Sequence, residues 1–190
     1  MSHLPRPQDA PPEVGGVFLT EPAIRARVAE LGARIADDYR QREIVLVTVL
    51  RGGVFFLADL CRAIDGPLRL DFIAITPYTE ARAGGVRITK DLDEDIEGKH
   101  VLIVEDIIDT GLTLNYLVGV LRARGPASLE IAVLLDRDQR RIADLPIAYR
   151  GFQMPDTFVV GYGLDLSGRL RNLPYVGTLS EDVLEGLGLG

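Results

Sequence analysis

The chain has 190 residues, 47% hydrophobic and 26% charged, a length and composition that suit one domain with a sizeable core. Its net charge of −7 argues against non-specific nucleic-acid binding, which depends on a basic surface. A single cysteine, Cys61, excludes an intramolecular disulfide, and two histidines are too few for a histidine metal cluster. We expect a cytoplasmic protein with no membrane partner, because there is no signal peptide and no apolar run of about 18 residues.

The first half of the chain alternates between helical and strand patterns. Residues 1–16 are rich in proline, so we expect a flexible lead-in before a single domain over 17–190. Apolar residues spaced on one face predict a helix over 20–39. The elements expected next are a strand over 44–50, a helix over 54–63, a strand over 68–75, a polar loop over 76–85 and a short strand over 86–90.

The second half continues the alternation. A buried run over 101–104 leads to a helix over 112–121, and further strands are expected over 131–135 and 158–162. This order predicts an α/β fold, with a doubly wound, mainly parallel sheet and helices on both faces.

The clearest functional signal lies over 101–113, which reads Val-Leu-Ile-Val-Glu-Asp-Ile-Ile-Asp-Thr-Gly-Leu-Thr. We interpret residues 105–113 as a strand-to-helix connection, a place where open α/β sheets bind ligands and where backbone N–H groups bind anions. Glu105 and Asp106 then stand beside a phosphate site as acceptors for hydroxyls or a hard cation. The alternative is that Asp109 or Thr110 only caps the helix, but three crowded carboxylates without a ligand would cost stability.

This segment closely resembles the phosphoribosyl-diphosphate signature of type I phosphoribosyltransferases, and in particular their hypoxanthine/guanine branch. The resemblance covers 20–179 and implies the fold of that family, with a small hood or base-binding region formed by N- and C-terminal segments. It implies that Asp109 is catalytic and accepts or shares the purine N7 proton. The residues implied for ribose and 5′-phosphate binding are Glu105, Asp106, Asp109, Thr110, Gly111, Leu112 and Thr113.

The pyrophosphate half of the donor has its own matches. The family places an Arg/Lys-Gly pair, often through a cis peptide, where this chain has Leu50-Arg51-Gly52-Gly53. Residues 76–85 resemble the hood loop of the family, although Pro77 stands where relatives usually carry serine. Without the resemblance, these segments would be an ordinary turn and an exposed hairpin loop. The residues implied for pyrophosphate binding are Arg51, Gly52, Tyr78 and Arg171.

The purine half is implied by two later segments. Phe158 would stack on the base, the backbone of Val159 would read its Watson–Crick edge, and Asp165 would hold magnesium. Arg137 stands where relatives carry a lysine that reads the purine 6-oxo group, and this replacement is not neutral because arginine is larger and planar. A rim arginine without a base contact is the alternative. The metal ligands implied for Mg²⁺ are Glu105, Asp106 and Asp165.

The resemblance thus implies a magnesium-dependent purine-salvage enzyme. It would transfer phosphoribosyl from phosphoribosyl diphosphate to N9 of hypoxanthine or guanine, as a homodimer or homotetramer without a nucleic-acid partner. An enzyme acting on xanthine or another base is one alternative, which Arg137 keeps open. Another is a non-catalytic, nucleotide-sensing regulator, which would need a basic RNA-binding face. A plain scaffold domain would leave the acidic loop unexplained.

Overall fold

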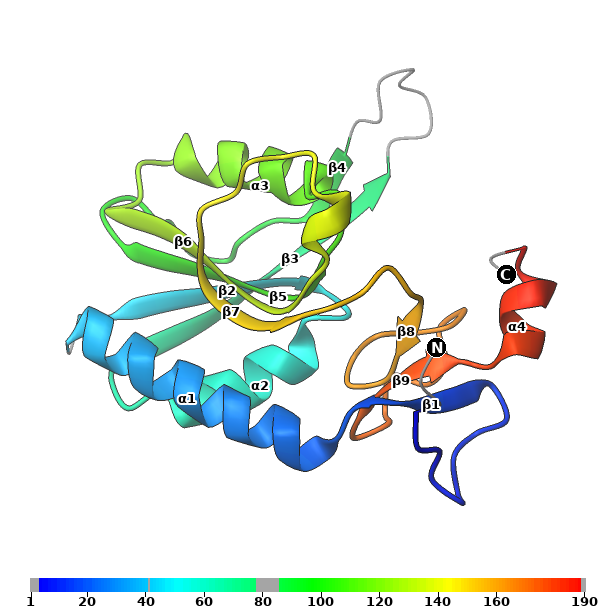
Figure 1. Ribbon diagram of the computed structural model, residues 1–190. Coiled ribbons are helices and arrows are strands. Elements are labelled where there is room, and N and C mark those ends of the chain that lie inside the picture. The colour runs from blue at the N-terminus through cyan, green and yellow to red at the C-terminus, as the bar shows by residue number, and fades with distance from the viewer. Residues whose placement is uncertain (1–3, 41, 78–85, 189–190) are drawn as a thin grey trace.

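The computed structural model describes residues 4–40, 42–77 and 86–188, and its centre is a six-stranded sheet (Figure 1). The strands are β2 (Ile44–Leu50), β3 (Leu68–Pro77), β4 (Val86–Lys90), β5 (His100–Ile108), β6 (Ser128–Asp136) and β7 (Ile147–Gln153). They lie in the order β4-β3-β2-β5-β6-β7, and every pair is parallel except β3 with β4. The expected α/β fold with a mainly parallel sheet is confirmed.

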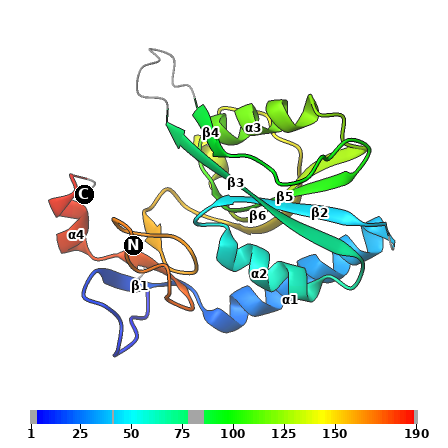
Figure 2. The same ribbon diagram turned by 180° about the vertical axis from the view of Figure 1, so that it is seen from behind.

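Helices cover both faces of this sheet (Figures 1 and 2). Helix α1 (Glu21–Tyr39) and helix α2 (Val54–Ala63) pack on one face, and helix α3 (Leu112–Arg122) packs on the other. The helix expected over 20–39 is confirmed: Thr20 is its N-cap and accepts a hydrogen bond from the Ala23 N–H at 3.4 Å. Its predicted apolar face, Ile24, Val28, Leu31 and Ile35, is buried in the core.

A small second sheet joins the two ends of the chain. Its strands lie in the order β1 (Val14–Leu19), β9 (Val176–Leu179) and β8 (Val159–Val160), and each neighbouring pair is antiparallel. A short C-terminal helix, α4 (Glu181–Gly186), follows β9. Strand β1 begins inside the stretch 1–16 expected as a lead-in, because Val14 is fully buried and pairs with Leu179. The strand expected over 158–162 contains only the two residues of β8. This sheet is the small region expected from N- and C-terminal segments.

Strand β5 is longer than the sequence pattern indicates, and this changes where the acids lie. Its pairing with β6 continues to Ile108, which is opposite Asp136. Glu105 and Asp106 are therefore strand residues, and the connection to α3 is only 109–111 rather than the predicted 105–113. The difference arises because backbone pairing with a neighbouring strand holds polar residues in a strand that an apolar run alone does not include.

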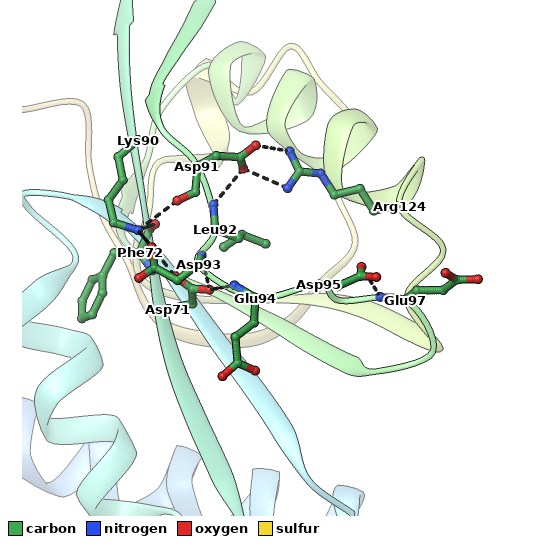
Figure 3. A network of polar contacts seen from close by, with 10 residues as sticks. All are labelled: Asp71, Phe72, Lys90, Asp91, Leu92, Asp93, Glu94, Asp95, Glu97 and Arg124. Atoms are coloured by element: carbon green, nitrogen blue, oxygen red, sulfur yellow. Dashed lines mark hydrogen bonds and ion pairs between the residues drawn. The ribbon is translucent and has the colours of Figure 1, made fainter.

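The segment after β4 is tied to the sheet by a polar network (Figure 3). The buried carboxylate of Asp71 accepts hydrogen bonds from the backbone N–H groups of Asp93 (2.9 Å) and Glu94 (3.3 Å). Lys90 donates to the Phe72 carbonyl at 3.0 Å, and Arg124 at the end of α3 donates to Asp91 at 2.8 Å. These contacts fix the base of the β3–β4 pair. In the described part of the chain, no helix is long and apolar enough to span a membrane.

Candidate active site

The two acids at the end of β5 point to opposite faces of the sheet, as successive strand residues do. Glu105 is 9% exposed, and burial, followed by the charge of Asp106, raises its pKa well above the usual range. Burial also raises the pKa of Asp106, although the Ile107 N–H donates to its Oδ1 at 2.8 Å. Glu105 Oε1 is buried without a hydrogen-bond partner among the described residues. Such an atom is stabilised by a hydroxyl donor or a cation that arrives with a ligand.

Next to Glu105 lies an open cavity of about 220 Å³ at the start of α3. Its lining residues are Val49, Ile75, Glu105, Ile107, Ile108, Asp109, Thr110, Gly111, Thr113, Leu114 and Leu117. The N-cap of α3 is Gly111, in the left-handed conformation with φ 77° and without a side-chain cap. Neither Asp109 nor Thr110 is thus the N-cap residue, although the Leu112 N–H donates to the Thr110 hydroxyl at 3.5 Å. Leu112 is 54% exposed and is absent from this lining, so only its backbone N–H remains as a possible anion contact.

Asp109 and Arg137, which the sequence places far apart, meet at the edge of this cavity. Arg137 Nη1 lies 3.5 Å from Asp109 Oδ2, and its Nη2 donates to the Thr157 carbonyl at 2.5 Å. Asp109 Oδ1 and Arg137 Nε are both buried without a partner among the described residues. One free acceptor and one free donor therefore belong to the same ion pair.

The aromatic and backbone groups expected to hold a base follow Thr157. The Phe158 ring is 38% exposed, whereas Val159 is buried in β8 and pairs with Thr178 of β9. The exposed ring thus comes from a segment fixed on both sides, by Arg137 through Thr157 and by the small sheet through Val159.

The Arg51-Gly52 turn lies between β5 and the segment after β8. The Leu50–Arg51 peptide bond is cis. A Cβ atom on Gly52 would lie 1.8 Å from Asp106 Oδ2, and one on Gly163 would lie 2.2 Å from the Gly52 carbonyl oxygen. Only glycine at both positions allows this close stacking, and Gly163 also has a positive φ of 99°.

Arg171 and Asp165 complete this stack. Arg171 donates to the Gly163 carbonyl at 2.5 Å and forms an ion pair with Asp165 at 2.6 Å. The charge of Arg171 also opposes the rise in the Asp106 pKa that burial causes. The structure therefore brings Gly52, Asp106, Asp165 and Arg171 together, and Arg51 precedes Gly52 in the same turn.

Two sequence-based expectations, the contact of Tyr78 and the metal ligands, stay predictions. Tyr78 and most of the loop over 76–85 lie outside the described residues. Within 4–40, 42–77 and 86–188, no three His, Cys, Asp or Glu side chains are grouped closely enough to hold a metal ion. The role of Glu105, Asp106 and Asp165 as magnesium ligands therefore stays a prediction.

The sequence interpretation also missed several charged residues around Arg137. Arg140 Nε lies 2.7 Å from Asp156 Oδ1, and Arg140 Nη1 lies 3.9 Å from Asp109 Oδ2. Arg141 pairs with the fully buried Asp136. The only signal was the dense run of charge over 136–141, directly after a buried strand.

The family of the chain follows from its similarity to known proteins. A model of the phosphoribosyl transferase domain matches residues 17–167, well over half of the chain. The chain belongs to the phosphoribosyl transferase family.

Relatives in this phosphoribosyl transferase family are similar over nearly their whole length. Hypoxanthine-guanine phosphoribosyltransferase of Mycobacterium avium is 46% identical over 183 residues, which cover 92% of this chain and 90% of that protein. Hypoxanthine phosphoribosyltransferase of Haemophilus influenzae is 49% identical over 166 residues, covering 85% and 93%. A solved structure of the Trypanosoma cruzi hypoxanthine phosphoribosyl transferase has a TM-score of 0.88 at 40% identity, covering 98% of this chain and 100% of that one.

Proposed function

We propose that this phosphoribosyl transferase is a purine-salvage enzyme. It transfers the 5-phosphoribosyl group from phosphoribosyl diphosphate to N9 of hypoxanthine or guanine, and releases pyrophosphate with IMP or GMP. The observation that carries the proposal is that Glu105 of β5, whose buried Oε1 has no partner among the described residues, stands with Asp106 beside an anion turn, residues 109–111, at the start of α3. The similarity to hypoxanthine-guanine phosphoribosyltransferases supports the choice of reaction.

The donor sugar and its 5′-phosphate bind along 105–113. Glu105 and Asp106 accept hydrogen bonds from the ribose hydroxyls, one of which supplies the donor that Glu105 Oε1 lacks. The 5′-phosphate binds the backbone N–H groups and hydroxyls of 109–113. The transition state resembles an oxocarbenium ion, so these fixed acceptors also stabilise positive charge at the sugar.

The leaving pyrophosphate binds on the other side of the acids. Arg51 and Arg171 neutralise its charge, the Gly52 backbone approaches it closely, and Tyr78 is an additional contact. Magnesium supplies further neutralisation of this leaving group when it is bound. Mg²⁺ commonly uses one or two carboxylates together with substrate phosphates and water, so Asp165, with Glu105 and Asp106, fits it without a three-residue cluster.

The base binds between Phe158 and the Asp109–Arg137 pair. A 6-oxopurine with a proton on N7 presents an acceptor, O6, beside a donor, N7–H. The Arg137 guanidinium is a donor and the Asp109 carboxylate an acceptor, so the pair is complementary to these two groups of the base. Adenine carries an amino group in place of O6 and would direct a donor at Arg137. Asp109 then accepts the N7 proton as N9 forms its bond to the sugar.

The test is direct incubation with magnesium and phosphoribosyl diphosphate, with hypoxanthine, guanine, xanthine or adenine added separately. Nucleotide formation from hypoxanthine or guanine is the expected result. No product from any base would contradict the enzyme assignment, and product from xanthine or adenine alone would contradict the specificity.

By analogy with the family, we also propose a cytoplasmic homodimer or homotetramer that acts on small molecules. Analytical ultracentrifugation of the purified chain measures the assembly, and a monomer at all concentrations would contradict it.

A further inference from the structure

The turn between β6 and β7 lies against the anion turn. Its residues Ile142 and Ala143 donate their backbone N–H groups to the Thr110 carbonyl, at 3.0 and 3.2 Å. The same turn begins at Arg137, whose N–H donates to the Ile108 carbonyl at 3.0 Å. One short segment therefore contacts both ends of the connection from β5 to α3.

The contact with Thr110 sets the direction of a group that the phosphate needs. In a planar trans peptide the C=O and the following N–H point to opposite sides. Holding the Thr110 carbonyl toward Ile142 and Ala143 thus turns the Gly111 N–H away from them. The cavity beside Gly111 is lined by residues of β2, β3, β5 and α3, and by none from 141–145. The turn between β6 and β7 thus contacts residues 110–111 on the side opposite the cavity.

Gly111 also fits closely against this support. A Cβ atom at Gly111 would lie 2.9 Å from Leu145 Cδ1 and 3.2 Å from Arg141 Cδ. The Arg141 side chain passes under the anion turn and is 16% exposed. Its guanidinium pairs with Asp136, which is fully buried at the end of β6. A buried carboxylate is costly unless it is paired, so Asp136 favours the position of Arg141 strongly.

We propose that Arg141, anchored by Asp136, is a positioning residue that holds the Thr110–Gly111 peptide in the orientation that binds the 5′-phosphate. The inference deepens the proposed function and rests on it. Arg141 touches no substrate; it acts through the backbone of 142–143 on Thr110. The base-reading Arg137 has contacts of its own, with the carbonyl groups of Ile108 and Thr157.

Arg150 provides a matched control. Its Nε forms an ion pair with Asp136 Oδ2 at 2.5 Å, without the geometry of a hydrogen bond, so Asp136 keeps one cationic partner when either arginine is removed. Arg150 belongs to β7, is 54% exposed, and carries no backbone contact with Thr110 in the described structure. Arg141→Met and Arg150→Met therefore remove the same charge from the same buried partner, but only the first loosens the anion turn.

The experiment compares KM for phosphoribosyl diphosphate, KM for hypoxanthine, and the affinity for IMP in these two variants. Arg141→Met is expected to raise the donor KM and weaken IMP binding by roughly 10- to 100-fold, because a displacement of about 1 Å can cost 10²-fold. Its KM for hypoxanthine stays close to that of the unsubstituted protein. Arg150→Met leaves all three values close to those of the unsubstituted protein. Arg141→Lys, which keeps a cation near Asp136, recovers part of the loss.

Equal effects of the two Met variants would overturn the inference, as would a change in the hypoxanthine KM alone. If Arg141→Met does not fold, as judged by its thermal transition, the same three values are compared between Arg141→Lys and Arg150→Lys. A larger loss of donor and IMP affinity in Arg141→Lys then supports the inference, and equal effects overturn it. Failure of the unsubstituted protein to bind donor or IMP would instead contradict the proposed function itself. The two failures are therefore distinguishable.

Discussion

Replacing Gly52 by alanine tests whether the close stacking of the Arg51-Gly52 turn on β5 matters for catalysis. The new Cβ would lie 1.8 Å from Asp106 Oδ2 and 2.8 Å from its Cγ. Carbon–oxygen contacts are normally about 3.3 Å or longer, so the groups must separate by roughly 1.5 Å. Asp106 cannot turn away freely, because its Oδ1 accepts from the Ile107 N–H at 2.8 Å.

The backbone of the Arg51-Gly52 turn cannot move away from Asp106 freely either, because the Gly52 carbonyl packs on Gly163. Gly52→Ala therefore displaces a ribose acceptor or the pyrophosphate turn. We expect kcat/KM for the donor to fall by about 10²-fold or more. The assay follows IMP formation from hypoxanthine at varied donor concentration. A variant with nearly unchanged kcat/KM would refute the reasoning.

Gly119→Ala is the control for this substitution. Gly119 lies inside α3, and nothing stands within 4 Å of a Cβ placed there. Alanine is favoured over glycine in a helix interior by about 0.5–1 kcal/mol. We expect this variant to keep its activity and to have a higher Tm.

Three further predictions concern single site residues. Asp109→Asn should lower kcat by about 10²–10⁴-fold with little change in donor affinity, and near-normal turnover would exclude Asp109 from the proton transfer. Arg137→Lys should change the KM for the base by roughly tenfold through its charged hydrogen bonds, and an equal change in the donor KM would contradict this role. Because burial raises the Glu105 pKa, the folded protein keeps a proton that the unfolded chain loses above its ordinary value of 4.5. The free energy of unfolding therefore falls as pH rises from that value through the raised pKa, and Glu105→Gln should make this fall shallower in denaturant unfolding at several pH values. An unchanged pH slope would contradict it.

Local sequence patterns predicted much of this fold, because the signals were local. The spacing of Ile24, Val28, Leu31 and Ile35 defines the buried face of α1, and a helix period needs no distant partner. Strands β1 and β9 had no such signal. Each is short and becomes a strand by pairing with the other, although most of the sequence separates the two.

The site divides in the same way. Residues 105–113 span the end of β5 and the start of α3, and the Arg51-Gly52 turn follows β2, so the rule that ligands bind at strand ends places them together. Asp136 and Arg141 escaped notice because their importance comes from burial and from one backbone contact with Thr110, neither of which leaves a local pattern. The ion pair of Asp109 and Arg137 likewise depends on the alignment of β5 with β6.

The small sheet has a consequence for how the protein is made. Val14 pairs with Leu179, and Val159 obtains its strand partner only from Thr178. Residues 1–150 contain every strand of the large sheet except the end of β7, and they contain none of the β9 residues. The phosphate-binding half can therefore form before synthesis ends, whereas the base-binding segment around Phe158 and Val159 is held in place only after β9 is available to pair with β8. A nascent chain, or one that ends before residue 176, would contain the anion turn but would lack the strand that holds the base-binding segment.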